Sequence, residues 1–321
     1  MIVVGGEALV DLVPAPATEP GQTGALRPLL PRLGGGPYTT AVALGRLGAP
    51  VAFLSRISTD AFGDALVDRL SGAGVRLDLL QRGSEPTTLA VVTLADDGSA
   101  RYTFHVQGTA DRLVTDPGPL PEEVTTLSVG TLGMVLDPGA SVYETMLHRE
   151  AAAGRLTVLD PNIRTSLIDD PAAYRARFAT WLPSVGLLKA SIEDAWWLAD
   201  APEGTDVLPL AKDWLRAGVG AVVLTRGADG LTALTETVGK VDVPAVRTQV
   251  ADTIGAGDTV HAALLAWLTA HGVRGAAGLR DLDADAWREA LGYAAKAAAI
   301  TVSRVGAEPP FATELVNSEI R

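Results

Sequence analysis

The sequence lacks cysteine altogether and has only four histidines among its 321 residues. A chain without cysteine has no disulfide framework and no thiolate metal site, and its scattered histidines do not have the spacing of metal ligands. No apolar run is long enough to span a bilayer. Basic residues are also scarce, because 26 lysines and arginines stand against 38 acidic residues, for a net charge of −12. This balance argues against a nucleic-acid partner, although backbone dipoles can still bind a small polyanion.

The hydrophobic content of 47% is sufficient for a large core, and the length fits one large domain over residues 1–321. The chain opens on Ile2-Val3-Val4, which is typical of a strand and unlike a signal peptide. We therefore expect a cytoplasmic protein without a membrane partner.

Short apolar runs alternate with amphipathic segments along most of the chain. The alternation predicts an α/β fold, doubly wound, in which helices cover both faces of a largely parallel sheet. Runs typical of buried strands lie at residues 51–57, 124–129, 156–159, 185–189 and 221–224.

Two further strands interrupt this alternation. Residues 87–94 and 101–106 flank Asp96-Asp97-Gly98 and predict a β-hairpin. The proline-rich piece 14–31 is unsuited to a central strand or helix and is expected to form an irregular flap. Together these segments predict a small sheet that stands apart from the main one.

The most informative stretch runs from Val250 to His271. Gly255-Ala256-Gly257 is a turn that opens a helix, since apolar residues recur at helical spacing from Val260 onward. Free N–H groups and the positive end of the helix dipole make such a turn an anion site. Asp258 lies in the first helical turn, where the dipole should keep its carboxylate ionised. A carboxylate beside an anion site suggests a general base that works next to a phosphoryl group.

Other polar residues are expected at the carboxyl ends of strands. In an open α/β sheet these ends share one rim, where ligands bind. Asp11 would follow the first strand, although an ordinary solvated loop carboxylate is an equally good interpretation. The residues expected on the rim besides Asp11 are Asp160, Asn162, Arg164, Thr225 and Asp258.

The chain resembles the ribokinase-like (PfkB-type) carbohydrate kinases through two separate motifs. Residues 252–259, DTIGAGDT, are similar to the C-terminal signature of that family. Gly34-Gly35-Gly36-Pro37, with residues 60–63 (DAFG) at the expected distance, is similar to the N-terminal one. Residues 6–11 (GEALVD) and 160–164 (DPNIR) resemble the fructokinase and 2-keto-3-deoxygluconate kinase branch.

The resemblance implies a doubly wound α/β domain with a small β-sheet lid formed by about residues 12–33 and 85–110. It implies an ATP-dependent kinase that phosphorylates the primary hydroxyl of a small, fructose-like sugar. Alternatives are a kinase for another sugar, for a sugar acid such as 2-keto-3-deoxygluconate, or for a nucleoside. A regulator that binds sugar or nucleotide without catalysis is a further alternative, against which the intact Asp258 counts. Lids of this family often form dimer contacts, so a homodimer is compatible with it.

The resemblance also assigns roles to single residues. Asp258 would be the base, and Gly255, Ala256 and Gly257 would donate N–H groups to the transferred phosphoryl group. The sugar would contact Asp11, Gly35, Gly36, Thr39, which replaces the usual asparagine, and Asn162, and Arg164 would bind substrate or phosphate. ATP would contact Ser191, Thr225, Gly227 and Ala295.

Two departures concern metal ions. Residues 191–194 (SIED) replace the Asn-x-x-Glu motif that organises Mg²⁺, so the acid there becomes the shorter Asp194. Many members also hold K⁺ behind the anion site, and Pro310 stands where a serine can contribute. A weak dependence on K⁺ is therefore expected. The matching positions for this monovalent cation are Asp252, Ile254, Thr301 and Gly306.

Overall fold

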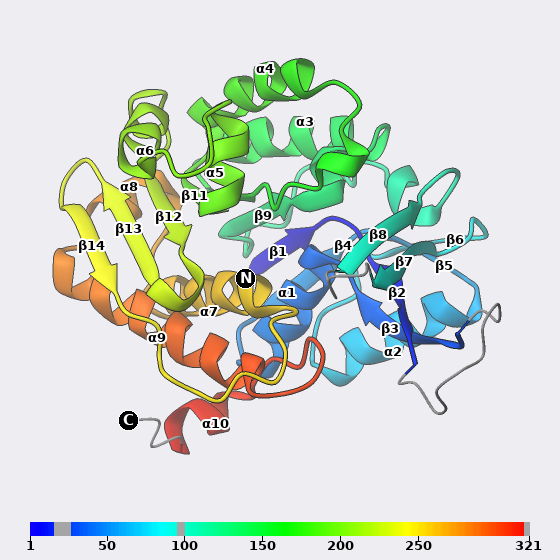
Figure 1. Ribbon diagram of the computed structural model, residues 1–321. Coiled ribbons are helices and arrows are strands. Elements are labelled where there is room, and N and C mark those ends of the chain that lie inside the picture. Colours follow the sequence, from blue (N-terminus) through cyan, green and yellow to red (C-terminus); the bar gives the residue numbers. More distant parts are fainter. Residues whose placement is uncertain (16–26, 95–99, 318–321) are drawn as a thin grey trace.

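The computed structural model describes residues 1–15, 27–94 and 100–317 and shows a large sheet between two layers of helices (Figure 1). The sheet has eight strands in the order β14-β13-β12-β11-β10-β9-β1-β4. Its strands are parallel from β12 to β4, whereas β13 and β14 form an antiparallel hairpin at one edge. The strand bounds are β1 Ile2–Gly5, β4 Val51–Leu54, β9 Thr126–Gly130, β10 Leu156–Asp160, β11 Leu187–Ser191, β12 Ala221–Thr225, β13 Leu231–Thr235 and β14 Gly239–Val243.

Each face of the large sheet is covered by its own helices. One buried cluster includes Ile2 and Val4, and the other includes Val3, so alternate residues of β1 point to opposite layers. The first layer contains α1 Gly36–Arg46, α2 Ala61–Gly72, α7 Ala256–Ala270, α8 Gly275–Arg280, α9 Ala284–Val302 and α10 Ala312–Asn317. The second contains α3 Gly139–Ala152, α4 Pro171–Trp181, α5 Ile192–Leu198 and α6 Val207–Arg216. These layers confirm the predicted doubly wound α/β fold.

Short 3₁₀ helices occupy several connections of the large domain. They are η1 Ala110–Leu113, η2 Thr131–Met134, η3 Thr165–Leu167, η4 Leu182–Ser184 and η5 Gly227–Asp229. Three of them, η2, η3 and η5, follow the carboxyl ends of β9, β10 and β12 and belong to the rim described below.

A second, four-stranded sheet stands beside the carboxyl end of β1. Its order is β3-β2-β7-β8, and β7 and β8 are antiparallel, as the predicted hairpin requires. The bounds are β2 Leu9–Pro14, β3 Leu29–Gly34, β7 Thr88–Leu94 and β8 Ala100–His105. We call these four strands the lid sheet. The expected turn at Asp96-Asp97-Gly98 lies outside the described residues.

The end of the proline-rich piece joins the small sheet as its edge strand β3, where Pro31 is tolerated, so the piece belongs to the small sheet as predicted. Two local predictions were wrong. Residues 51–57 do not form one strand, because the chain leaves the large sheet after Leu54 and β5 Arg56–Ser58 pairs with β6 Gln81–Gly83. Asp11 does not follow β1 but lies within β2, on the lid sheet.

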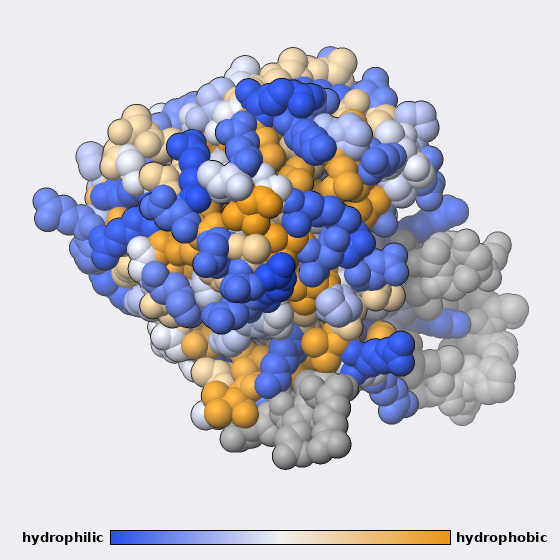
Figure 2. All heavy atoms as spheres, turned by 90° about the vertical axis from the view of Figure 1, so that its left-hand side faces the viewer, coloured by the Kyte–Doolittle hydropathy of each residue, from blue (hydrophilic) through white to orange (hydrophobic). Residues whose placement is uncertain are grey.

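The β14 edge of the large sheet is protected by charge. Lys240 and Asp242 are exposed on this strand, and their side chains pair at 2.7 Å. Charged side chains on an edge strand oppose pairing with another chain. Figure 2 views the molecule from this side and shows hydrophobic patches separated by hydrophilic side chains. Among the described helices, none is both long and apolar enough to cross a membrane.

Candidate active site

The turn before α7 has the geometry of an anion site. Gly255 caps the helix with a φ of 76°, and a Cβ there would approach the Ala307 Cβ to 2.7 Å. Both the positive φ and the close approach to Ala307 require glycine at this position. The amides of Gly257 and Asp258 have no hydrogen-bond acceptor within the described residues. The amide of Ala256 donates to the Thr253 carbonyl at 3.3 Å.

Asp258 projects from the first turn of α7 and is partly buried. Burial raises its pKa to about 7, and the nearby Lys189 lowers it less than burial raises it. Desolvation therefore opposes the expected effect of the helix dipole, so the carboxylate is only partly ionised near neutral pH. A carboxylate with a pKa near 7 is well matched to general-base catalysis at neutral pH.

Glu7 connects the glycine-rich loop before α1 to the end of β9. Its buried carboxylate accepts hydrogen bonds from the amides of Gly36 and Gly133, each at 3.1 Å, and from the hydroxyl of Thr131. Burial raises the pKa of Glu7 to about 7. Glu7 was not among the predicted site residues, although the GEALVD motif contains it.

Gly36 brings three of the predicted site residues together. A Cβ at this position would lie 3.3 Å from Asn162 Nδ2 and 3.4 Å from Asp258 Oδ1. Gly35, just before it, has a φ of 107°, and a Cβ there would lie 2.8 Å from the Glu7 carbonyl oxygen. Both glycines are therefore needed for close approach of the backbone, as a ligand-binding loop requires.

The predicted sugar contacts come from the lid sheet and from α1. Asp11 is partly buried in β2, and burial raises its pKa to about 6 against the opposing charge of Arg164. Thr39 is buried on α1, and its Cγ2 would lie 3.6 Å from a Cβ on Gly255. Thr39 therefore approaches the α7 turn, whereas Asp11 lies on the lid sheet near the charge of Arg164.

Asn162 and Arg164 follow the end of β10. Asn162 has a φ of 39°, and its Oδ1 accepts a hydrogen bond from Arg164 Nη1 at 2.8 Å. All hydrogen bonds of the exposed Arg164 guanidinium go to neutral oxygens, and no carboxylate of the described chain pairs with it. The charge of Arg164 is therefore available to an anion.

Two of the predicted nucleotide contacts are neighbours in the sheet. Ser191 ends β11 beside Thr225, which ends β12, and Gly227 opens η5 with a φ of 54°. Ala295 is buried in α9 and packs in the core, on the same layer as α7. The structure thus places Ser191, Thr225 and Gly227 on the rim, but it directs the side chain of Ala295 inward.

Asp194 has a structural task at the start of α5. Ser191 and Asp194 form a capping box at the start of α5, in which Asp194 Oδ2 accepts from the Ser191 amide at 3.0 Å. Its Oδ1 accepts from the Ile163 amide at 2.8 Å and so ties α5 to the loop that carries Arg164. Within the described chain no three acidic or histidine side chains are grouped to hold a metal ion.

The side chain of Asp252 joins two loops that carry candidate ligands for a monovalent cation. Asp252 Oδ1 accepts from the Ile254 amide at 3.0 Å, and Oδ2 accepts from the Gly306 amide at 2.8 Å. Thr301 is buried, and its hydroxyl lies 3.0 Å from that of Thr259 on α7. Asp252, Ile254 and Gly306 are therefore together, whereas the side chain of Thr301 is engaged inside the helical layer.

A buried ion pair beneath the rim was missed. Lys189 Nζ donates to Asp160 Oδ2 at 2.7 Å, and both side chains are buried. The sequence pattern predicts Asp160 on the rim and Lys189 in a strand, but it does not predict that they pair. A lysine inside the apolar run of a buried parallel strand is unusual, and that signal could have revealed it.

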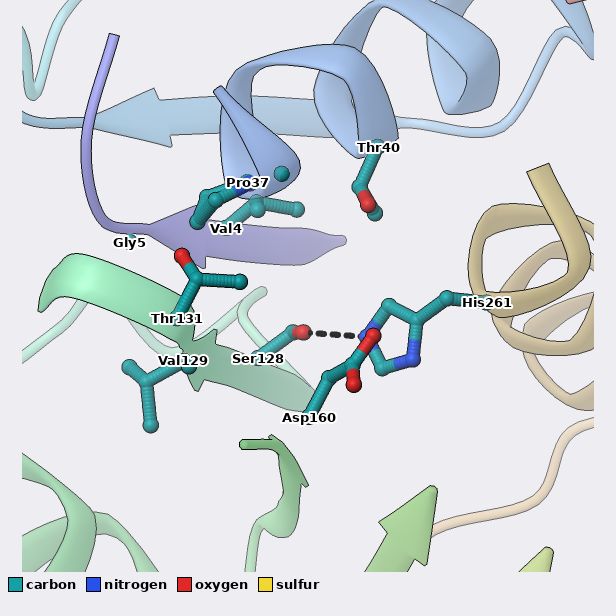
Figure 3. A pocket seen from close by; sticks show the side chains of 11 residues that line it. Val4, Gly5, Pro37, Thr40, Ser128, Val129, Thr131, Asp160 and His261 are labelled. Atoms are coloured by element: carbon teal, nitrogen blue, oxygen red, sulfur yellow. Dashed lines mark hydrogen bonds between the residues drawn. The ribbon is translucent and has the colours of Figure 1, made fainter. Parts of the chain in front are cut away.

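A cavity of about 10 Å³ lies between this ion pair and the glycine-rich loop, large enough for one water molecule. Figure 3 shows Ser128, Asp160 and His261 around it, with Ser128 Oγ 2.7 Å from His261 Nε2. Asp160 Oδ1 has no hydrogen-bond partner in the described chain. Burial lowers the pKa of His261 to about 3, so this histidine is neutral and not a general acid at pH 7.

The fold and the site together are those of an enzyme that transfers a phosphoryl group to an alcohol. A carboxylate with a pKa of about 7 stands beside free amides at a helix start, on the rim of a doubly wound sheet. The sequence model of the family described as "pfkB family carbohydrate kinase" matches residues 1–314, so the chain belongs to this family.

Known relatives agree with this assignment. The fructokinase of Rhizobium leguminosarum bv. trifolii is 38% identical over 270 residues, which are 84% of this chain and 79% of that protein. The crystal structure of fructokinase with bound ATP from Xylella fastidiosa is 28% identical, with a TM-score of 0.85 over 98% of this chain and 96% of that one. Aminoimidazole riboside kinase from Salmonella enterica, 24% identical over 98% of this chain and 97% of that one, shares the fold with a TM-score of 0.79.

Proposed function

We propose that this carbohydrate kinase transfers the γ-phosphoryl group of ATP to the primary hydroxyl of fructose. The observation that carries the proposal is the carboxylate of Asp258, whose pKa is about 7, beside the free amides of the α7 turn. The substrate is supported by two relatives that are named fructokinases, from Rhizobium leguminosarum bv. trifolii at 38% identity and Klebsiella pneumoniae at 33%. ATP is supported by the Xylella fastidiosa structure, which contains it.

The reaction follows from the position of these groups. Asp258 accepts the proton of the sugar hydroxyl, and the resulting oxygen nucleophile forms a bond to the γ-phosphorus while the bond to the β-phosphate oxygen breaks. The free amides of Gly257 and Asp258 donate to the negative charge on the transferred group. Arg164, which no carboxylate of the described chain neutralises, adds a positive charge next to Asn162.

Sugar recognition is assigned to the groups that face the base. The carboxylate of Asp11 accepts hydrogen bonds from sugar hydroxyls, and the backbone at Gly35 and Gly36 lets the sugar approach Asp258 closely. Thr39 and Asn162 add a hydroxyl and an amide. The lid sheet would then close over the sugar and exclude water that hydrolyses ATP. The predicted lid, about residues 12–33 and 85–110, overlaps these four strands.

The lid sheet also offers a surface for a homodimer. Leu29 and Leu30 on β3 and Tyr102 on β8 are about two-fifths exposed, at 40%, 39% and 42%. These exposed apolar side chains lie on the two edge strands of the lid sheet, where a second copy of the chain could pack. Light scattering would decide this point, since a monomeric mass at micromolar concentration would exclude the dimer.

Metal ions enter this proposal through the nucleotide. Both oxygens of Asp194 accept backbone amides, so the residue fits a water-mediated contact with Mg²⁺ that ATP carries. Such an ion would neutralise phosphate charge at the rim near Ser191 and Thr225. Asp252, the carbonyl of Ile254 and Gly306 fit one side of a K⁺ site behind the α7 turn.

The proposal is tested by ADP release against a panel of acceptors. Fructose should give the highest kcat/KM among fructose, ribose, glucose, 2-keto-3-deoxygluconate and a nucleoside, with no acceptor as the background. A higher value for the sugar acid or the nucleoside would reassign the substrate. ATP binding without acceptor-dependent ADP release would show a binding protein in place of a kinase.

A further inference from the structure

We propose that Lys189 is a positioning residue whose ammonium group, held in place by Asp160, sets the ionisation of the base Asp258. The inference rests on the proposed role of Asp258 as the base. It assigns a function to the buried ion pair beneath the rim, which takes no direct part in the transfer described above.

The ammonium group lies directly below the α7 turn. Lys189 is the third residue of β11 and only 3% exposed, and its Nζ lies 2.7 Å from Asp160 Oδ2. A Cβ on Gly257 would be 3.4 Å from Nζ. The missing side chain at Gly257 thus lets the positive charge reach the turn that carries Asp258.

Asp160 accepts only one of the hydrogen bonds that the ammonium group of Lys189 can donate. An ammonium group has three donors, and within the described chain Lys189 hydrogen-bonds only to Asp160. The carboxylates of Asp160, Asp194 and Asp258 all act on its charge. Lys189 is moreover the only buried lysine or arginine of the described residues, so it is the one cation near the base that water does not screen.

Four charged side chains act on the ionisation of Asp258. Lys189 on β11 and the exposed Arg164 after β10 favour its ionised form, whereas Asp160 on β10 and Glu7 after β1 oppose it. His261, one turn further along α7, is neutral. Lys189 gives the largest of the effects that favour the carboxylate, and Asp160 the largest charge effect against it.

Removal of the charge of Lys189 and removal of the charge of Asp160 should shift the ionisation of Asp258 in opposite directions. Without the ammonium group, Asp258 should hold its proton to higher pH, and the enzyme should need a higher pH to become active. With a neutral side chain at position 160, the ammonium group remains and one opposing charge disappears. Asp258 should then ionise at lower pH.

The experiment compares the pH profiles of kcat/KM for the sugar in wild type, Lys189→Met and Asp160→Asn. The midpoint of the acidic limb, where kcat/KM rises with pH, should move to higher pH by about one unit in Lys189→Met. In Asp160→Asn it should move to lower pH by a smaller amount. This is the scale expected when a charge near a carboxylate is removed. The midpoint of a profile does not depend on the amount of folded enzyme. A purely structural role would therefore lower activity at all pH values without moving the limb.

Matched controls and a second variant complete the design. Arg216→Met and Asp213→Asn remove the same charges from an exposed pair on α6 and should leave the limb in place. The double variant Lys189→Met/Asp160→Asn leaves no unpaired buried charge and protects the test against misfolding. Its limb should lie between those of the two single variants. If Lys189→Met does not fold, the downward shift in Asp160→Asn decides.

Two results would overturn the proposal: limbs that stay within about 0.3 pH units of wild type, or limbs that move in the same direction. Either result leaves the proposed kinase activity intact, provided that wild type releases ADP with fructose and Asp258→Asn does not. Loss of fructose-dependent ADP release in wild type itself would instead refute the proposed function.

Discussion

The rim of the large sheet and the lid sheet both hold candidate site residues, but they rest on very different cores. The rim strands lie between two large buried clusters, and Glu7, Asp160 and Lys189 are fixed there by buried hydrogen bonds. The lid sheet rests on a small cluster of Leu9, Ala90 and Leu132. Its outer strands expose Leu30 and Tyr102 at 39% and 42%.

This difference suggests a division of labour. Groups that stabilise a transition state must be held rigidly before the reaction, which suits the rim. Groups that admit and then enclose a substrate must move, and elements with few buried contacts open at low free-energy cost. Changes on the rim should therefore act on kcat, whereas changes on the lid sheet should act on KM.

The largest effect is expected at the base on the rim. Asp258→Asn should lower kcat by roughly 10²–10⁴, the usual scale of general-base catalysis, and should leave ATP binding unchanged. Steady-state kinetics with fructose and calorimetry with ATP would measure both. Turnover close to wild type in this variant would remove Asp258 from the role.

The matching change on the lid sheet is Asp11→Ala. It should raise the KM for the sugar by roughly 10- to 100-fold, because one or two charge-assisted hydrogen bonds are lost, and should lower kcat far less. Since the pKa of Asp11 is about 6, the wild-type KM should rise as the pH falls below 6, whereas that of the variant should not. An unchanged KM in the variant would identify Asp11 as an ordinary strand carboxylate.

The pH dependence of thermal stability should reveal the cost of burying the ionised Asp258 on the rim. Burial raises the folded-state pKa of Asp258 from 3.8 to about 7. The contribution of the protonated side chain to the free energy of unfolding is therefore fully present below pH 4 and is lost as the pH rises through 7. Asparagine does not titrate. The Tm of Asp258→Asn should therefore equal that of wild type near pH 4 and exceed it by a few degrees at pH 8, on the order of 1–3 kcal/mol. Asp213→Asn serves as the exposed control, and a constant difference across this pH range would contradict the assignment.

The lid sheet should differ from the rim in hydrogen exchange. Amides of β7 and β8 should exchange faster than those of β10 and β11 without ligand, because the core beneath the lid sheet is small. Fructose should slow exchange in β7 and β8 several-fold, and ATP alone should slow it less, since the lid closes on the sugar. Full protection of these strands without sugar would refute the lid.

The rim was also the more predictable of the two regions. The glycine turn and Asp258 are contiguous in sequence, and the alternating apolar runs locate the strand ends around them. The position of Asp11 was missed, because the strand that contains it pairs with β3 and β7, far away in sequence. The ionisation of Asp258 depends on burial and on Lys189, which the fold alone brings near it. Local patterns identify such residues, but not their surroundings.

The smallest effect is expected behind the α7 turn. Asp252 already joins this turn to the loop at Gly306 through hydrogen bonds of 3.0 and 2.8 Å, so the turn is held without an ion. Pro310 is buried and has no side-chain oxygen to offer as a ligand. Replacement of tetramethylammonium by K⁺ at constant ionic strength should therefore raise kcat by less than about twofold, a fraction of 1 kcal/mol in the barrier. Asp252→Ala, which removes both hydrogen bonds, should lower kcat more than the absence of K⁺ does. A tenfold or larger activation by K⁺ would show that the remaining oxygens bind the ion well without a ligand at position 310.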